Sequence, residues 1–271
     1  MTESVARLRG EQLTLGYGKY TVAENLTVEI PDGHFTAIIG PNGCGKSTLL
    51  RTLSRLMTPA HGHVWLDGEH IQHYASKEVA RRIGLLAQNA TTPGDITVQE
   101  LVARGRYPHQ PLFTRWRKED EEAVTKAMQA TGITHLADQS VDTLSGGQRQ
   151  RAWIAMVLAR ETAIMLLDEP TTRLDISHQI DLLELLSELN REKGYTTAAV
   201  LHDLNQACRY ASHLIALREG KIVAQGAPKE IVTAELIERI YGLRCMIIDD
   251  PVAGTPLVVP LGRTAPSTAK I

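Results

Sequence analysis

One glycine-rich segment constrains the fold more than any other part of this 271-residue chain. Residues 40–47 read Gly-Pro-Asn-Gly-Cys-Gly-Lys-Ser, which satisfies the pattern G-x-x-x-x-G-K-S. The segment follows a short apolar run at 36–39 and precedes Leu49, Leu53 and Leu56, which are spaced to share one face of a helix. Glycines let such a backbone curl so that its N–H groups converge on phosphate oxygens, and the following helix adds its positive end. The sequence therefore predicts a strand–loop–helix unit that binds phosphate groups.

Every residue of this loop is a candidate for nucleotide binding. Lys46 can reach terminal phosphates and Ser47 can ligate Mg²⁺, whereas Cys44 is expected to contribute its backbone N–H alone. A glycine-rich turn that merely closes a strand–helix unit is the alternative, and the correct flanking pattern argues against it. The candidate residues are Gly40, Pro41, Asn42, Gly43, Cys44, Gly45, Lys46, Ser47 and Thr48.

Two acidic residues follow a second apolar run, at 164–167. Carboxylates at the carboxyl end of a strand lie where open α/β sheets bind their ligands. Asp168 is a candidate Mg²⁺ ligand, directly or through water, and Glu169 is a candidate general base for an attacking water. An apolar run ending in Asp-Glu is common at strand ends, so this interpretation depends on the phosphate loop being present as well.

Short apolar runs and helical patterns alternate along the chain, which is typical of an α/β fold. Further buried strands are expected at 83–87 and 197–201, and an amphipathic helix is expected to contain residues 182–189. Residues 5–35 alternate as antiparallel strands do, with a turn at 31–33. The first part of the chain is therefore expected to form an antiparallel sheet beside a parallel core.

Residues 89–143 differ from the rest, because they give two helical patterns, at about 97–106 and 118–131, and no convincing strand. Beyond the core, a strand is expected at 221–225 and short helices within 228–241. Together these patterns predict one domain over residues 1–263, made of a core at about 5–88 and 144–245, a helical subdomain at 89–143, a C-terminal extension at 246–263 that forms a hairpin, and a flexible tail at 264–271.

The amino-acid composition indicates which classes of partner and which cellular compartment to expect. The 29 basic and 31 acidic residues give a net charge of −2, which argues against a nucleic-acid partner. Three widely spaced cysteines fit no zinc or disulfide framework, so a reducing cytoplasm is expected. No apolar run approaches the roughly 18 residues that a spanning helix needs, and the start of the chain does not read as a secretory signal. The chain is therefore expected to reach a membrane only by docking.

Residues 144–148, Leu-Ser-Gly-Gly-Gln, add a second candidate anion-binding segment, since a serine N-cap followed by glycines leaves backbone amides uncovered. With the phosphate loop and Asp168-Glu169, this segment resembles the signature motif of the ATP-binding subunits of ABC transporters. The resemblance extends from about Leu8 to Leu243. It implies an α/β, ABC-type nucleotide-binding domain with a RecA-like core, an N-terminal antiparallel β subdomain and a helical insert, acting on ATP with Mg²⁺.

The resemblance also implies roles for isolated polar and aromatic residues. Tyr17 matches the aromatic that stacks on adenine, with Tyr20 as the alternative. Gln88 matches the glutamine that contacts Mg²⁺ and the attacking water. His202 matches the switch histidine at the terminal phosphate. A lone glutamine or histidine is more often structural, so both roles rest on family position alone.

A dimer follows from the same resemblance. In this family the signature residues of one subunit bind the nucleotide held by the phosphate loop of the other. Asp175 matches the loop through which the subunits touch, and Arg173, just before it, departs from the small, aromatic or histidine residue usual there. An interfacial cation must either find a carboxylate or extend to solvent. The residues expected to complete the site of a second copy are Ser145, Gly146, Gly147 and Gln148.

Several strings are most similar to the importers of iron(III)–siderophore complexes, namely 100–102 with 105–109, 153–156, 175–179, 202–207 and 234–243. The resemblance implies ferric enterobactin as cargo, two inner-membrane permease subunits, a periplasmic siderophore-binding protein, and a peripheral position on the cytoplasmic face of the membrane. The alternatives are a haem or cobalamin importer, an export or lipid-flipping subunit, and a soluble ABC-type ATP switch of DNA repair or translation.

Overall fold

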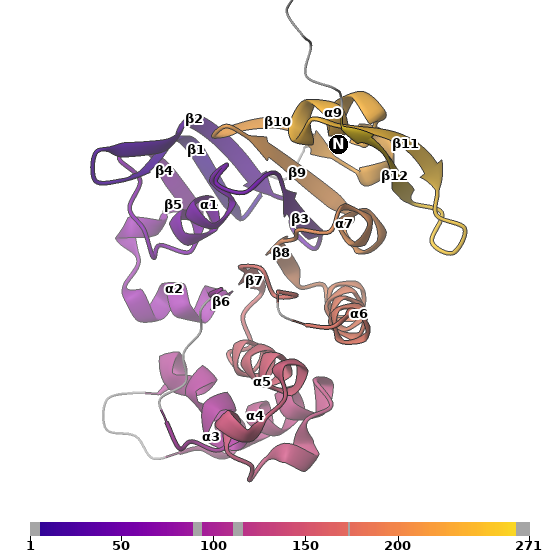
Figure 1. The fold of residues 1–271 in the computed structure, drawn as a ribbon. Coiled ribbons are helices and arrows are strands. Elements are labelled where there is room, and N and C mark those ends of the chain that lie inside the picture. The colour runs from indigo at the N-terminus through magenta and orange to yellow at the C-terminus, as the bar shows by residue number, and fades with distance from the viewer. Residues whose placement is uncertain (1–5, 89–93, 111–115, 173, 264–271) are drawn as a thin grey trace, which may run out of the picture.

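The computed structural model describes residues 6–88, 94–110, 116–172 and 174–263. Figure 1 shows an antiparallel sheet beside a larger core sheet, with a group of helices at the far end. The antiparallel sheet has the strand order β2-β1-β4-β5. Its strands are β1 (Leu8–Tyr17), β2 (Tyr20–Ile30), β4 (His61–Leu66) and β5 (Glu69–His70).

The core sheet has the order β10-β9-β3-β8-β7-β6, and only β10 runs antiparallel to its neighbour. Its strands are β3 (Phe35–Ile39), β6 (Ile83–Leu86), β7 (Ile164–Leu167), β8 (Thr196–Val200), β9 (His213–Arg218) and β10 (Lys221–Gly226). Ala37 and Ile39 face one hydrophobic cluster and Ile38 the other, so both faces of the sheet are covered. Because β3, β8, β7 and β6 are parallel neighbours, their carboxyl ends meet at one edge.

Helices cover both faces of this sheet. Figure 1 shows α6 and α7 on one side and α1 on the other. The helices outside the helical end are α1 (Lys46–Leu53), α2 (Ser76–Arg82), α6 (Ile176–Lys193), α7 (Leu204–Tyr210), α8 (Pro228–Ile231) and α9 (Ala234–Tyr241), with a 3₁₀ turn at Ile71–His73. Leu182, Leu186 and Leu189 of α6 are buried in the cluster that contains Ile39, as their spacing predicts.

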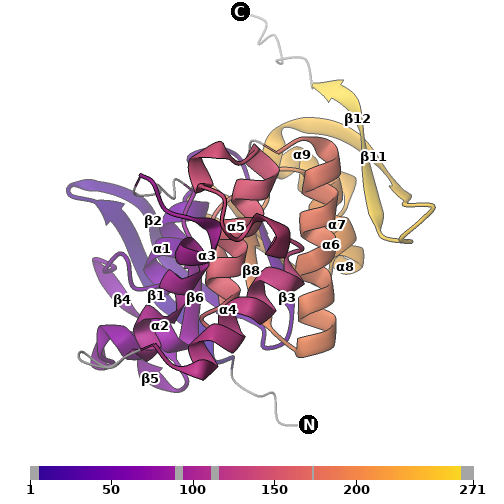
Figure 2. The ribbon, with the colours of Figure 1, turned by 90° about the horizontal axis from the view of Figure 1, so that it is seen from below.

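The helical end consists of α3 (Val98–Ala103), α4 (Lys118–Ala130) and α5 (Gly146–Leu158), with 3₁₀ turns at Arg104–His109, Thr134–Leu136 and Val141–Thr143. α3 packs against both α4 and α5, and the three helices lie together in both views (Figure 2). Arg106 is buried here and pairs with Asp120. α5 precedes β7 in the chain and so joins these helices to the core. The limits of the helical subdomain stay a prediction.

The first helix is shorter than its leucine pattern predicts. α1 ends at Leu53, and Leu56 is not in the helix but 65% exposed, so the expectation for Leu56 is wrong. Arg55 takes a left-handed backbone conformation, with φ of 61°, that turns the chain away. Its guanidinium donates to the carbonyl oxygens of Ile71 (3.3 Å) and Tyr74 (2.6 Å), which holds this turn in place.

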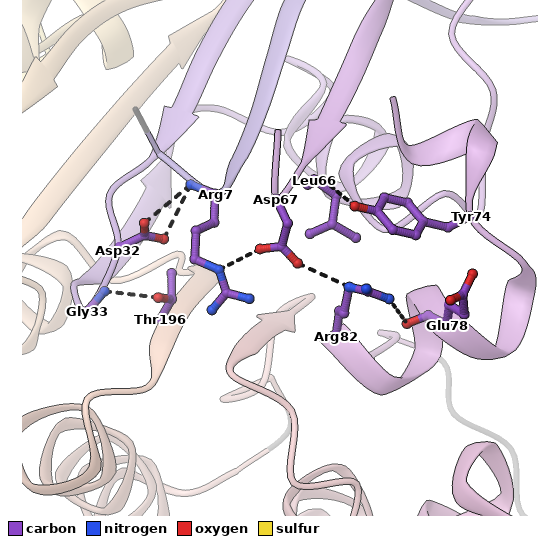
Figure 3. Close-up of polar contacts among 9 residues, drawn as sticks. All are labelled: Arg7, Asp32, Gly33, Leu66, Asp67, Tyr74, Glu78, Arg82 and Thr196. Carbon is purple, nitrogen blue, oxygen red and sulfur yellow. Dashed lines mark hydrogen bonds and ion pairs between the residues drawn. The ribbon is translucent and has the colours of Figure 1, made fainter. Parts of the chain in front are cut away.

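A polar cluster fixes α2 to the antiparallel sheet (Figure 3). Asp67, after β4, accepts from Arg7 Nε at 2.6 Å and from Arg82 Nε at 3.1 Å. The hydrogen bond that Arg7 donates to Asp67 raises the pKa of Arg7, outweighing burial. The Arg82 guanidinium lies 4.5 Å from the ring centre of Tyr74, whose hydroxyl donates to the Leu66 carbonyl at 3.0 Å. Because α2 leads directly into β6, this cluster also positions the residues that follow β6.

The C-terminal hairpin of β11 (Leu243–Asp249) and β12 (Pro256–Arg263) stands out from the body in Figures 1 and 2. Asn205 of α7 anchors it by two hydrogen bonds to the backbone of Val258, at 2.8 and 3.3 Å. The hairpin confirms the C-terminal extension as a pair of strands; the tail at 264–271 lies outside the described residues. Within the described part of the chain, no helix combines the length and the apolar character needed to cross a membrane.

Candidate nucleotide-binding site

The phosphate loop wraps around its own lysine. Gly40 has φ of 148° and Gly45 has φ of 105°, conformations that residues with a β-carbon rarely adopt. A β-carbon at Gly40 would also collide with the carbonyl oxygen of Leu217. Lys46 is 5% exposed, and its Nζ donates to the carbonyl oxygens of Gly40 (2.7 Å) and Pro41 (2.9 Å). Two of its three ammonium protons therefore hold the loop, and the third can serve a phosphate.

A serine and a buried aspartate form an oxygen site beside the loop. Ser47 Oγ donates to Asp168 Oδ1 at 2.7 Å. Asp168 is 2% exposed, and its Oδ2 atom has no hydrogen-bond partner; Arg51 Nε is 3.9 Å from it, outside hydrogen-bond distance. Burial raises the pKa of Asp168 despite the hydrogen bond from Ser47. A hydroxyl and a carboxylate oxygen that lacks a partner are the hard ligands that Mg²⁺ prefers, so these residues fit that ion.

Glu169 is held from three directions. His202 Nε2 lies 2.8 Å from its Oε1, while Gln88 Nε2 and Thr172 Oγ1 donate to its Oε2 at 2.7 and 3.1 Å. Burial alone would raise its pKa, but the hydrogen bonds with His202, Thr172 and Gln88 outweigh burial and lower it. The carboxylate is therefore ionised at neutral pH and can accept a proton. Its backbone takes a left-handed conformation, with φ of 54°.

These groups converge because they follow neighbouring strands: the loop follows β3, His202 follows β8, Glu169 follows β7 and Gln88 follows β6. They surround a pocket of about 500 Å³. Tyr17 Oη lies 3.4 Å from Thr48 Oγ1 at the rim, with Tyr20 opposite Tyr17 across the hairpin of β1 and β2. The lining residues are Tyr17, Tyr20, Val22, Asn42, Gly43, Gly45, Lys46, Ser47, Thr48, Gln88, Glu169 and His202.

The signature segment lies outside this pocket, at the start of α5. Ser145 caps the helix: its hydroxyl accepts from the backbone N–H of Gln148 at 3.3 Å, and its own N–H donates to the Gln148 side chain at 3.0 Å. Ser145 and Gly146 are exposed. Gly146 lines a second pocket of about 200 Å³ that also contains Asp168 and Glu169. The chain therefore brings the loop and the strand-end residues together and leaves residues 145–148 outside.

Asp175 also lies outside the pocket, as the N-cap of α6. Its Oδ1 accepts from the backbone N–H of His178 at 3.0 Å and from Ser177 Oγ at 3.0 Å. The hydrogen bond from the backbone N–H of His178 has the largest effect on the pKa of Asp175, and the hydrogen bond with the His178 side chain has the next largest. The pKa of Asp175 is lowered to about 2. Arg173 lies outside the described residues. Thr172, which contacts Glu169, is missing from the sequence prediction; the turn in which its N–H donates to the Glu169 carbonyl is the local signal for it.

Comparison with known proteins agrees with this geometry. The ferric enterobactin transport ATP-binding protein of Escherichia coli (strain K12) is 99% identical over 269 residues, covering 99% of both chains. Among solved structures, a transporter assigned to the metal-chelate ABC type, in an inward-facing conformation, has a TM-score of 0.82 at 29% identity and covers 95% of this chain and 98% of that chain. A dimeric ATP-binding cassette, MJ0796, bound to ADP and phosphate, has a TM-score of 0.71 at 28% identity and covers 81% and 98%.

The same comparisons confirm the fold class, an ATP-binding cassette with an antiparallel β subdomain and a parallel core sheet. Within residues 6–88, 94–110, 116–172 and 174–263, no group of three His, Cys, Asp or Glu residues could hold a metal ion. Residues 23–172 match the family described as ABC transporter. The chain therefore belongs to the ATP-binding proteins of the ABC transporter family.

Proposed function

We propose that this chain binds and hydrolyses ATP to power import of ferric enterobactin. The observation that carries the hydrolytic part is the position of the Glu169 carboxylate, which His202 and Gln88 hold in the pocket that contains Lys46. The cargo is inferred from the relative at 99% identity, whose name states ferric enterobactin transport. That identity favours the catecholate siderophore over haem, cobalamin, an exported substrate or a soluble ATP switch.

The residues divide the chemistry among them. The loop amides and Lys46 bind the terminal phosphates of ATP, and Tyr17 stacks on adenine. Ser47, Asp168 and Gln88 would hold Mg²⁺, which would neutralise charge that develops on the phosphates. Water attacks the terminal phosphorus, Glu169 takes one proton from that water, and ADP leaves with the bridging oxygen. His202 orients Glu169 and contacts the transferred phosphate.

A second copy of the chain completes each site. Ser145, Gly146, Gly147 and Gln148 do not line the pocket that contains Lys46 in their own chain. We infer that they bind nucleotide held by a partner copy, with Asp175 at the contact between the two. A solved cassette of this family is a dimer with ADP and phosphate, which supports this arrangement.

The partners beyond the dimer are two permease subunits of the inner membrane, which place the chain on its cytoplasmic face, and a periplasmic protein that delivers the siderophore. A groove of about 690 Å³ on the helical end supports a docking role. Its lining includes the exposed aromatics Tyr107 and Trp116. The fold match to an inward-facing transporter is consistent with such a complex.

Replacement of Glu169 by Gln tests the hydrolytic role. Turnover should fall roughly 10²–10⁴-fold if the carboxylate is the general base. The variant should still bind ATP and should elute at twice the monomer mass in size-exclusion chromatography with ATP. Glu188→Gln, at an exposed position on α6, is the matched control and should keep wild-type turnover. Unchanged turnover in Glu169→Gln would remove the proposed role.

Transport is tested by uptake of radioactive iron in cells that lack this subunit and are complemented with the chain. Ferric enterobactin is compared with ferrichrome and ferric citrate, and labelled cobalamin is assayed in parallel. Restored uptake of ferric enterobactin alone is expected. Restoration of another substrate would refute the proposed cargo, whereas salt-sensitive binding to DNA or ribosomes without uptake would favour a soluble ATP switch.

A further inference from the structure

Two sequence strings that mark the siderophore branch, 175–179 and 202–207, contact each other in the fold. Gln206 Nε2 on α7 donates to Gln179 Oε1 on α6 at 2.8 Å. The amide nitrogen of Gln179 contacts the preceding loop: Nε2 donates to the carbonyl oxygens of Leu174 (2.9 Å) and Thr171 (3.4 Å). One side chain therefore ties the loop that follows Glu169 to the helix that follows His202.

His178, the neighbouring residue, makes a second connection. Its Nδ1 lies 2.6 Å from Asp175 Oδ1, which anchors the ring to the subunit-contact loop. The other side of the ring covers Gly147 in the signature segment. A β-carbon at Gly147 would collide with Cδ2 of His178 and lie 2.8 Å from its Cγ, closer than real β-carbons approach. Only glycine therefore lets the imidazole seat against the start of α5.

We propose that His178 and Gln179 are positioning residues for ATP hydrolysis. Together they hold three segments in one arrangement: the loop containing Thr172, the start of α5, and the start of α7 behind His202. This inference rests on the proposed function, because the three segments matter only if the chain is an ATPase that works as a dimer. Neither residue lines the phosphate-loop pocket, so neither is a catalytic residue.

The contacts predict which kinetic constant changes. Thr172 donates to Glu169, so loosening its loop displaces the general base. The start of α5 serves the nucleotide of the partner copy, so loosening it weakens closure of the dimer. The loop residues that hold nucleotide in the same chain keep all of their own contacts. Loss of either residue should therefore lower kcat and leave the nucleotide affinity of the isolated chain unchanged.

The contacts of His178 and Gln179, which we call the brace, also connect the two sites of the dimer. Glu169 acts on nucleotide in its own chain, whereas Gly147 acts on nucleotide held by the partner. His178 and Gln179 connect the surroundings of both within one chain. Closure at one site is then transmitted to the other, and variants that break the brace should lower the Hill coefficient for ATP as well as kcat.

The test uses the assembled transporter and five variants. His178→Ala and Gln179→Leu should each lower kcat roughly 10–100-fold, because a displacement of about 1 Å near a reacting group can cost 10²-fold. His178→Asn keeps an amide donor for Asp175 and should recover part of that loss. Gln179→Leu combined with Gln206→Leu should cost no more than Gln179→Leu alone, since both changes remove the same hydrogen bond. Glu188→Ala on α6 is the matched control.

A second readout does not depend on ATPase activity. Hydrogen exchange of the backbone amides at 146–147 and 171–172 in the full chain should quicken in His178→Ala and Gln179→Leu and stay unchanged in Glu188→Ala. Wild-type exchange together with wild-type kcat would overturn the brace. Equal losses of kcat and nucleotide affinity would also overturn it, as would a lowered thermal midpoint with no recovery in His178→Asn. A wild-type chain without ATPase activity would instead refute the proposed function, and the exchange result would still decide whether the brace exists.

Discussion

The buried Arg106 should be among the most costly charged residues to remove. It is 5% exposed and donates to Asp120 Oδ1 (2.9 Å), Glu161 Oε2 (2.7 Å) and the Ala159 carbonyl (2.8 Å). Arg106→Met would leave the Asp120 carboxylate, itself 4% exposed, without its cation. Breaking a buried pair in this way costs about 3–5 kcal/mol. Glu161 adds little, because its side chain is 53% exposed and can turn to water.

The loss is measured by thermal unfolding, followed by circular dichroism. A change of this size lowers the midpoint by roughly 6–20 °C in a chain of this length. Asp120→Asn added to Arg106→Met should recover part of the loss, because the uncompensated charge is then removed. Lys118→Met, which breaks the exposed pair with Glu122 on the same helix, should cost less than about 1 kcal/mol. A decrease below about 2 °C for Arg106→Met would show that water reaches Asp120, and the reasoning would fail.

Three further outcomes follow from the site. Gly40→Ala should abolish nucleotide binding, measured with a fluorescent ATP analogue, because a β-carbon there collides with the Leu217 carbonyl; normal affinity would contradict this. Asp175→Asn should lower the thermal midpoint above pH 4, and this effect should shrink as pH falls toward 2, because the depressed pKa of Asp175 gives stability that is lost as pH falls through about 2. Burial raises the pKa of the Cys44 and Cys208 thiols, so iodoacetamide should label them slowly at pH 7 until the chain is denatured.

The sequence predicts the arrangement of the site well, because the relevant signals are local. Each catalytic candidate directly follows a short apolar run, and parallel strands buried on both faces need such runs. The strand at 164–167 is found at those residues, those at 36–39 and 83–87 differ by one residue at one end, and that at 197–201 is shifted by one residue toward the N-terminus. Once the strands are parallel neighbours, Gln88, Glu169 and His202 must meet at one edge with the loop.

The features that the sequence does not predict depend on contacts between distant segments. Leucine spacing cannot reveal that Arg55 reaches the Tyr74 carbonyl and ends α1 early. The strand β9 is absent from the prediction, although β3 pairs with it in the core. The strings at 175–179 and 202–207 stand out in the sequence only as branch markers. Their contact through Gln179 and Gln206 exists only because α6 and α7 pack together.

The positioning role proposed for Gln179 predicts that a residue outside the pockets can affect hydrolysis. Glu169 and Gln88 line both the phosphate-loop pocket and the smaller pocket beside α5, so changes in either pocket can reach the Glu169 carboxylate. Gln206 lies outside both linings but is joined to the Glu169 loop through Gln179. Tyr20 lines the larger pocket but is 71% exposed and can stack on adenine only at its rim. Gln206→Leu should therefore lower kcat more than KM, and Tyr20→Ala should raise KM more than it lowers kcat. Steady-state kinetics of the two variants test this prediction. If only proximity to the pocket mattered, Tyr20→Ala would lower kcat more than Gln206→Leu does.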